Sequence, residues 1–373
     1  MNTTNPKPIL VLGAYGEAGE AVVHRLVAEG LPIVASGRRP TALERLASSC
    51  PSIETLQLDV QDSEALASAT RAAGLVVNCV GPYIGTGLEI ARVAVSQGCS
   101  VIDLASEQEH HRRLQSLVPV CQEKGVTVLT GAGAYPGVSG LLLRGLLAQH
   151  PEATSAELAL ITGPPAESGR GAAQMLSGLA ELAHEHSVLA GGELVRVRPG
   201  SRRRFTFPEP FAERDVLAWP QLEILEAAAA ASIPNLSTFA ALGGHAPSPA
   251  FLLRAVSWLR PTTTSWSYAL LKQVLPRLKR PAAPNDPTTN QGAILVRVKE
   301  SGHWFETSVL ARDLRVATAW LPVLAAKRWA SGDWDGGVVA VPMGFFDAVA
   351  LTEAIRALRL AIDWNRAAGK SLD

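Results

Sequence analysis

A short apolar strand, a glycine-spaced turn and an amphipathic helix follow one another at the start of the chain. Residues 9–12 are all apolar, as in a buried strand, and Gly13, Gly16 and Gly19 follow with the spacing G-x-x-G-x-x-G. In nucleotide-binding units such glycines permit a tight turn, let the backbone approach a pyrophosphate and let the helix lie against the strand. The turn therefore predicts a dinucleotide site at the positive end of the helix dipole, with an ordinary structural turn as the alternative.

The expected phosphate-facing residues of this turn depart in two ways from the common pattern. The spacing differs from G-x-G-x-x-G, and Glu17 places a carboxylate close to the expected phosphates. The turn residues predicted to contact the cofactor are Gly13, Tyr15, Gly16, Glu17, Ala18 and Gly19.

The second predicted strand, residues 33–35, ends in a basic turn. An acidic residue at this place commonly holds the ribose 2′-hydroxyl of NAD, whereas an arginine accommodates the 2′-phosphate of NADP. Ser36, Arg38 and Arg39 stand here without an acid. We therefore expect NADP(H) as the cofactor. The alternative is a solvated basic turn before the next helix. That helix is predicted to start at Thr41, with Glu44 completing a capping box.

Two further strand ends are predicted to contact the cofactor. Residues 55–58 form a third strand, after which Asp59 and Val60 could frame the adenine ring. Residues 75–78 form a fourth strand that breaks at a Gly-Pro pair. Since open α/β sheets bind ligands at the carboxyl ends of their strands, we expect the nicotinamide half to lie against Val80, Gly81 and Pro82.

Strands and helices continue to alternate up to a second glycine-rich turn. Helices are predicted near residues 87–97 and 109–124, strands at 100–104 and 127–129, and a turn at 131–140 that opens another helix. This alternation predicts right-handed crossovers and a doubly wound parallel sheet.

Four segments of this region resemble the saccharopine dehydrogenase-like oxidoreductases, the group that includes saccharopine reductases and trans-acting enoyl reductases. They are VLGAYGEAGEAV from Val11, VVNCVGPYIGTG from Val76, VIDLASE from Val101 and GAGAYPGVSG from Gly131. Residues 317–342 are similar to the C-terminal segment of the same family. The resemblance implies a Rossmann domain at residues 1–150, an α+β substrate and dimerisation domain at 151–340, C-terminal helices at 341–373 that pack back on the first domain, and a homodimer.

The second half of the chain contains strand patterns compatible with this layout. Residues 155–161 alternate as a strand, and 293–299 are expected to pair with 304–310 around Ser301-Gly302. A hairpin of residues 195–197 with 204–207 is expected around Pro199-Gly200. Residues 163–186 suggest a glycine loop feeding a long helix, and 281–290 suggest a loop.

Three side chains are candidates for moving a proton. Tyr83 and Tyr135 follow the strands nearest the expected nicotinamide, and either phenol could donate a proton or simply line the wall of the site. Glu107 could orient a cationic substrate or act as an acid; the alternative is a carboxylate facing the dipole of the following helix.

The histidines and Cys79 are expected to have structural roles rather than catalytic or metal-binding ones. His110 and His111 are expected on a helix surface, Cys79 lacks a neighbouring base, and the spacing of His184 and His186 does not suit a metal site. No metal is therefore predicted.

Three further segments keep two interpretations each. Residues 168–171 could hold a carboxylate through Arg170 or form a surface loop, and the arginines 202–204 could form a solvated hairpin edge or contact a phosphate or a membrane. Residues 250–281 could bind a lipid surface or pack as core helices with basic ends.

Composition limits the partners. The chain has equal numbers of basic and acidic residues, 34 each, which argues against nucleic acid as a partner and favours a small-molecule substrate. The family resemblance suggests that this substrate could carry an amino or carboxylate group. Four cysteines without C-x-x-C spacing and no recognisable signal peptide lead us to expect a cytoplasmic protein. No apolar run approaches the roughly 20 residues of a membrane span.

Together these features predict an NADP(H)-dependent oxidoreductase that reduces a C=N, C=O or C=C bond of a small metabolite. The alternative is an NADP(H)-binding regulatory protein or scaffold without turnover. A complete proton relay beside the nicotinamide would distinguish the two, since hydride chemistry belongs to the cofactor while the protein supplies orientation and protons.

Overall fold

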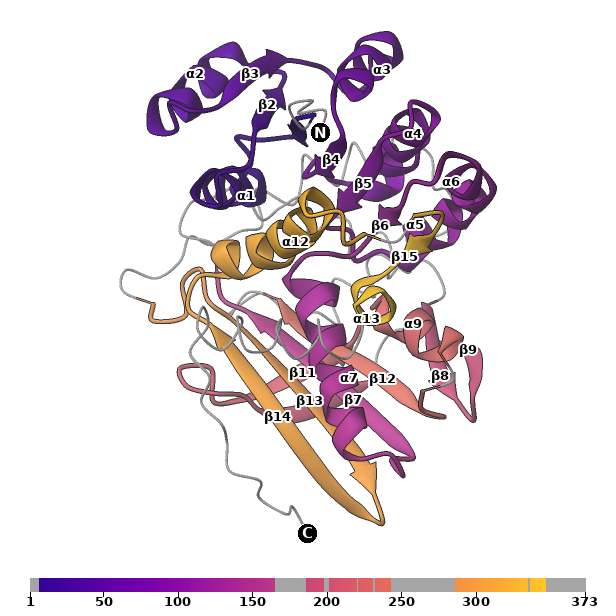
Figure 1. Cartoon of the computed structure of the whole chain (residues 1–373). Coiled ribbons are helices and arrows are strands. Elements are labelled where there is room, and N and C mark those ends of the chain that lie inside the picture. Colours follow the sequence, from indigo (N-terminus) through magenta and orange to yellow (C-terminus); the bar gives the residue numbers. More distant parts are fainter. Residues whose placement is uncertain are drawn as a thin grey trace, which may run out of the picture. The chain divides into compact units, whose positions relative to one another are not determined.

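The computed structural model describes residues 7–164, 186–197, 201–219, 221–230, 232–242, 286–334 and 336–346, which fall into two compact units. The first unit contains the described residues up to Val138 together with 315–345. The second contains those from Ser139 to Leu314 together with Phe346. Each unit is built around its own sheet (Figure 1).

The sheet of the first unit is parallel throughout and runs in the order β15-β6-β5-β4-β1-β2-β3. Read from β3, this is the doubly wound order 3-2-1-4-5-6, extended by one strand beyond β6. The predicted Rossmann fold is thus confirmed. The strands are β1 (Ile9–Leu12), β2 (Ile33–Gly37), β3 (Glu54–Gln57), β4 (Leu75–Asn78), β5 (Ser100–Asp103), β6 (Val128–Leu129) and β15 (Val339–Ala340).

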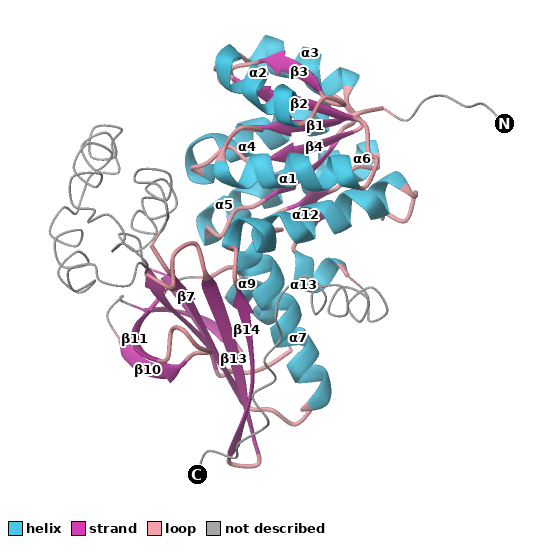
Figure 2. Ribbon diagram, turned by 90° about the vertical axis from the view of Figure 1, so that its left-hand side faces the viewer, coloured by secondary structure: helices cyan, strands magenta, loops and turns pink. Residues whose placement is uncertain are grey.

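Helices cover this sheet because its central strands are apolar on both sides. Alternate strand residues such as Leu10 and Val76 belong to one buried cluster with Leu66 and Ile90 of the connecting helices. Helices α1 and α12 lie side by side in Figure 1 and Figure 2. Lys327 of α12 places its Nζ 2.6 Å from the carboxylate of Glu29, the residue that follows α1. The helical segments are α1 (Glu17–Ala28), α2 (Pro40–Ser49), α3 (Ser63–Ala72), α4 (Tyr83–Ser96), α5 (Gln108–Leu114), η1 (Gln115–Leu117), α6 (Val118–Lys124), η2 (Ala134–Val138), α12 (Leu314–Ala330) and α13 (Pro342–Phe345).

Prolines move several helix boundaries away from their predicted positions. The predicted capping box is wrong, because α2 begins at Pro40 and no side chain caps it. Proline suits the first helical position, where its missing N–H would have no partner. Pro82 is the N-cap of α4, which begins at Tyr83 rather than near residue 87. The helix predicted at 109–124 is divided into α5, η1 and α6.

The second unit contains a mixed sheet in the order β10-β11-β12-β7-β13-β14, with β8 joining β12 and β9. Only the pairing of β7 with β12 is parallel among its described strand pairs. Helix α7 packs along β13 and β14 (Figure 2). The elements are α7 (Ser139–Gln149), β7 (Ser155–Thr162), β8 (His186–Ala190), β9 (Glu193–Val197), β10 (Arg202–Thr206), β11 (Glu213–Ala218), α9 (Glu223–Ala229), β12 (Leu236–Leu242), β13 (Gly292–Glu300) and β14 (His303–Ala311).

Two hairpins of this sheet are formed around two-residue turns. The pairing of β13 with β14 around Ser301 and Gly302 is confirmed, and both residues have positive φ, as a type I′ turn requires. The predicted hairpin of residues 195–197 with 204–207 is wrong: β9 pairs with β8 and β10 pairs with β11. Gly191 and Gly192, both at positive φ, provide the tight turn that joins β8 to β9.

The units divide the chain differently from the expected domain boundaries. Strand β15 pairs with β6 and therefore lies in the first unit, although 151–340 was the expected second domain. Helix α7 falls in the second unit. Residues 168–171, His184, Pro199-Gly200, 250–281 and the C-terminal segment 347–373 lie outside the described residues. In the described part, no helix is both long and apolar enough to cross a bilayer.

We expect Gly19→Ala to lower the free energy of unfolding by about 3 kcal/mol, because overpacking against rigid backbone cannot relax. A Cβ at Gly19 would stand 2.2 Å from the Gly13 carbonyl oxygen. The matched control is Gly85→Ala in α4, where a Cβ meets nothing within 4 Å. We expect this control to be neutral or to stabilise by up to about 1 kcal/mol. Urea unfolding measures both, and equal effects would contradict the close packing of α1 on the turn.

Candidate functional site

The glycine turn lies at the carboxyl end of β1 and leaves little room for side chains. Gly13 has φ +72°, and a Cβ there would approach both the Cys79 carbonyl oxygen and Val80 Cγ2 at 3.1 Å. Gly16 is the N-cap of α1, and no side chain caps this end of the helix. The turn is therefore a cradle that side chains would fill, and its helix end is open to an anion, which fits a pyrophosphate.

The helix that leaves this turn begins with two of the predicted site residues. Glu17 is the first residue of α1 and Ala18 the second, and both are partly buried. A carboxylate in the first turn interacts favourably with the helix dipole, so Glu17 is accommodated without a basic partner.

The end of β2 carries the predicted basic residues. Ser36 is buried within the strand, while Arg38 and Arg39 follow it with exposed side chains. Tyr15 joins this end to the glycine turn, because its hydroxyl oxygen accepts the backbone N–H groups of Arg38 at 3.0 Å and Arg39 at 3.1 Å. The guanidinium of Arg39 and two backbone N–H groups thus lie where the 2′ substituent of a dinucleotide is expected.

The end of β3 lies beside that of β2 in the sheet. Asp59 and Val60 follow β3 and are partly buried. The Asp59 carboxylate accepts the backbone N–H of Gln61 at 3.0 Å, which fixes the turn after the strand.

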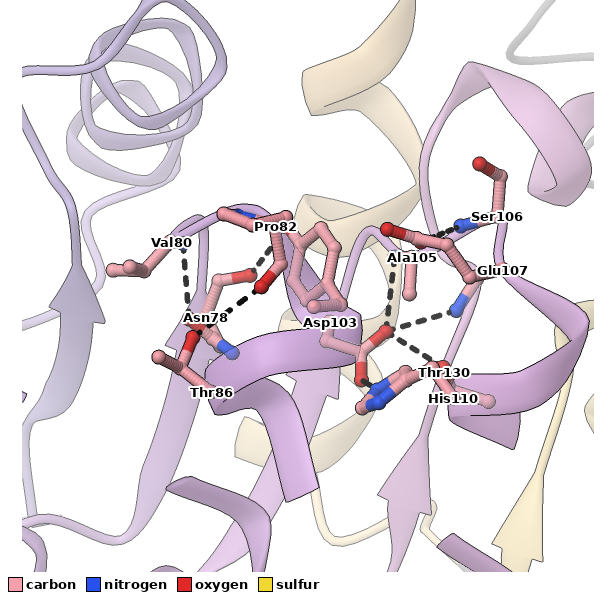
Figure 3. A network of polar contacts seen from close by, with 12 residues as sticks. Asn78, Val80, Pro82, Thr86, Asp103, Ala105, Ser106, Glu107, His110 and Thr130 are labelled. Carbon is pink, nitrogen blue, oxygen red and sulfur yellow. Dashed lines mark hydrogen bonds and ion pairs between the residues drawn. The ribbon is translucent and has the colours of Figure 1, made fainter. Parts of the chain in front are cut away.

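Asn78 shapes the end of β4 (Figure 3). Its side-chain oxygen accepts the backbone N–H of Val80 at 3.0 Å, and its backbone carbonyl accepts the Tyr83 hydroxyl at 3.1 Å. Gly81 and Pro82 continue this loop into α4. Burial and the nearby Asp103 raise the pKa of Cys79 to about 12, so this residue stays a thiol at neutral pH.

A buried carboxylate, Asp103, organises the end of the neighbouring strand β5. Figure 3 shows its oxygen atoms receiving hydrogen bonds from several segments. Oδ1 accepts the backbone N–H groups of Ala105 at 3.0 Å and Gly131 at 3.2 Å, and the Thr130 hydroxyl at 2.7 Å. Oδ2 lies 2.9 Å from Nε2 of His110. Both members of this pair are only 1% exposed.

The two charges stabilise each other inside the protein. Burial alone would raise the pKa of Asp103, but the charge and hydrogen bond of His110 outweigh it and lower that pKa. Burial alone would lower the pKa of His110, but the Asp103 carboxylate outweighs it and raises that pKa. The pair therefore favours an imidazolium beside a carboxylate.

The prediction that His110 lies on a helix surface is wrong. A Cβ at Gly87 would stand 2.5 Å from His110 Cε1, so the glycine of α4 makes room for the imidazole. Its Nδ1 is buried without a hydrogen-bond partner. His111 is partly buried, and burial lowers its pKa to about 4. The only sequence signal for the dyad was a carboxylate at a strand end followed seven residues later by a histidine.

Two of the three predicted proton carriers lie beside this dyad. The Tyr83 ring centroid is 5.8 Å from that of His110, and burial raises the pKa of Tyr83 well above its usual value. Glu107 is 2% exposed, its Oε2 accepts the backbone N–H of Ser106 at 2.9 Å, and burial raises its pKa. Tyr135 lies on a separate segment, η2, where burial also raises its pKa. In the described residues, no cluster of three or more possible ligands could hold a metal ion.

Fold and turn together define the first unit as a dinucleotide-binding domain of the Rossmann class. Residues 9–129 match the family model described as the saccharopine dehydrogenase NADP binding domain. This part of the chain is therefore similar to the NADP-binding domain of the family that the motifs resemble.

Curated relatives are similar to part of the chain. A probable mitochondrial saccharopine dehydrogenase-like oxidoreductase of Arabidopsis thaliana is 28% identical over 161 residues, which cover 38% of this chain and 36% of the relative. A lipid droplet localized protein of Caenorhabditis elegans is 28% identical over 138 residues, covering 34% and 32%. The chain thus spans about a third of the length of these curated relatives.

One solved structure shares the fold over nearly the whole chain. The apo saccharopine dehydrogenase (L-Glu forming) of Saccharomyces cerevisiae matches with a TM-score of 0.63 at 12% identity, covering 98% of this chain and 100% of that one. At this identity the similarity establishes the fold alone.

We expect His110→Asn to lower the free energy of unfolding by about 3–5 kcal/mol at pH 6, because it leaves a buried carboxylate without its cation. Because the pKa of His110 is raised in the folded state, this residue contributes to the free energy of unfolding fully below about pH 6.5. The contribution is lost as the pH rises through the folded-state pKa. Because the pKa of Asp103 is lowered in the folded state, its contribution to the free energy of unfolding is complete above about pH 4 and is lost in acid. The deficit of the variant should therefore be larger at pH 6 than at pH 9.

Urea unfolding at the two pH values tests this expectation. The exposed His303 provides the control, because His303→Asn should change the free energy of unfolding by no more than about 0.5 kcal/mol at either pH. A His110→Asn deficit that does not vary with pH would contradict the charged dyad.

Proposed function

We propose that this chain is an NADP(H)-dependent oxidoreductase that reduces a C=N, C=O or C=C bond of a small metabolite. The strongest support is the uncapped glycine cradle at the point where the strand order reverses, between β1 and β4. This is the place where open α/β sheets bind dinucleotides. Family members named as oxidoreductases support the same class of reaction.

Each part of the cofactor has a proposed set of contacts. The pyrophosphate would lie on the turn from Gly13 to Gly19, and the 2′-phosphate against Arg38 and Arg39, because no acid follows β2 there. Asp59 and Val60 would face the adenine, and the loop at Val80, Gly81 and Pro82 the nicotinamide. When bound, the cofactor supplies the hydride; the chain supplies position and protons.

A reduction also needs a proton, and the ends of β4 and β5 carry groups suited to hold one. Glu107 has a raised pKa, so its carboxyl retains a proton to higher pH than an exposed glutamate does. The Asp103–His110 pair acts on this carboxyl as well, but the charge of His110 lowers its pKa by less than burial raises it. The Tyr83 hydroxyl donates to the Asn78 carbonyl, which suits a wall residue better than a free donor. We therefore propose Glu107 as the proton donor and Tyr83 as part of the wall.

The same chemistry favours turnover over binding alone. A regulator that only senses the nucleotide has no use for a buried acid and a charged dyad beside the nicotinamide position. These groups cost stability when buried and are typical of sites that move protons.

Substrate, assembly and location complete the proposal. Zero formal charge supports a small neutral or zwitterionic substrate, one carrying an amino or carboxylate group in view of the family. All four cysteines are unpaired in the structure, which supports a reducing compartment, and we propose the cytoplasm. A homodimer is proposed from the family resemblance alone.

Calorimetric titration with NADPH and NADH tests the cofactor. We expect NADPH to bind more tightly, and Gly16→Val to abolish binding of both nucleotides, because its methyl groups would fill the cradle. We expect Arg38→Ala to weaken NADPH binding about tenfold or more and to leave NADH binding almost unchanged, as the loss of one charge-assisted hydrogen bond predicts.

The exposed Gly85→Ala serves as the control variant and should bind both nucleotides like the wild type. Thermal unfolding of each variant separates loss of binding from loss of fold. If neither nucleotide binds the wild type at millimolar concentration, the proposed function is contradicted.

A further inference from the structure

Tyr15 lies across the end of β2, in the place assigned to the adenosine 2′ substituent. Its ring packs on Gly37, where a Cβ would stand only 2.2 Å from Tyr15 Cε1. The guanidinium of Arg39 lies 4.7 Å from the ring centroid. The backbone N–H groups of Arg38 and Arg39 both donate to the phenol oxygen. A glycine, two N–H groups and a guanidinium thus form a fitted receptacle for one oxygen atom.

The surroundings of this oxygen are those of an anion site. Burial tends to raise the pKa of Tyr15, but hydrogen bonds from Arg39 and Arg38 and the charge of Arg39 outweigh it and lower that pKa. Helix α2 starts immediately afterwards, at Pro40, so the positive end of its dipole lies here as well. The donors stabilise negative charge on whichever oxygen they hold.

We propose that the Tyr15 hydroxyl occupies the position of a 2′-phosphate oxygen and competes with the 2′-phosphate of NADP(H) for these N–H groups, which makes Tyr15 a cofactor-specificity residue. This inference rests on the proposed function, because it concerns the same nucleotide site. It identifies the residue that limits the preference for the phosphorylated cofactor.

Competition follows from the hydrogen count at this site. Each backbone N–H carries one hydrogen, and both hydrogens are directed at the same phenol oxygen. A phosphate oxygen can receive them only when the phenol moves away. NADH presents a neutral hydroxyl at this position and gains less from the same donors, so displacement of Tyr15 affects NADPH more than NADH.

Tyr15→Phe tests the inference, because it keeps the ring on Gly37 and removes only the oxygen. We expect NADPH to bind about tenfold more tightly to this variant, the change that one or two freed net hydrogen bonds predict. NADH affinity should change by less than about threefold. The shorter probes 2′,5′-ADP and ADP should show the same difference by calorimetry, which places the effect at the adenosine end.

A second variant guards against a ring-packing effect. Tyr15→Ser removes the ring, and its hydroxyl is too short to reach the same donors, so the ratio of NADPH to NADH affinity should rise here too. Thermal unfolding of both variants reports whether the turn has kept its fold. Arg39→Gln is the opposite control and should weaken 2′,5′-ADP binding while leaving ADP binding almost unchanged.

The outcomes separate this inference from the proposed function. If the wild type binds NADPH and both Tyr15 variants keep its affinity ratio, the competition is wrong and the cofactor assignment stands. If Tyr15→Phe binds NADPH more weakly, the hydroxyl is a ligand of the phosphate, which overturns the competition as well. Absence of nucleotide binding by every protein contradicts both.

Discussion

Gly19 of α1 packs so closely on the carbonyl of Gly13 that a Cβ would stand 2.2 Å from its oxygen, and the rest of the site depends on this contact. Gly13 packs at the same time against the loop that follows β4. The start of α1, the end of β1 and the end of β4 therefore meet at one point. Because the strand order reverses between β1 and β4, this contact directs the positive end of a helix into the crevice of the sheet.

Asp103 is the second point on which the site depends. It connects β5 to the loop after β6 through Thr130 and Gly131, and to α5 through His110. A buried carboxylate with fewer partners would cost several kcal/mol, so these bonds make the charge tolerable. The charges of Asp103 and His110 both act on the buried carboxyl of Glu107, which is the N-cap residue of α5. Stability and the proposed proton chemistry thus involve the same side chains.

The sequence predicted the elements whose signals are local and missed those that depend on distant neighbours. The strand at residues 75–78 and the hairpin around Ser301-Gly302 were predicted correctly, because apolar runs and turn residues act over a few positions. His110 was misplaced because its burial depends on space left by Gly87 of another helix. The placement of Tyr15 on the end of β2 is likewise a tertiary contact, which no pattern around residue 15 could indicate.

We propose that a dinucleotide binds across the glycine turn with its 2′ end at β2 and its nicotinamide at β4. A crystal structure of the complex with NADPH tests it most directly. We expect electron density for the pyrophosphate at the start of α1, for the 2′-phosphate beside Arg38 and Arg39, and for the nicotinamide within contact distance of Val80 and Pro82. A nucleotide bound elsewhere on the chain, or in the reverse orientation in this crevice, would contradict it.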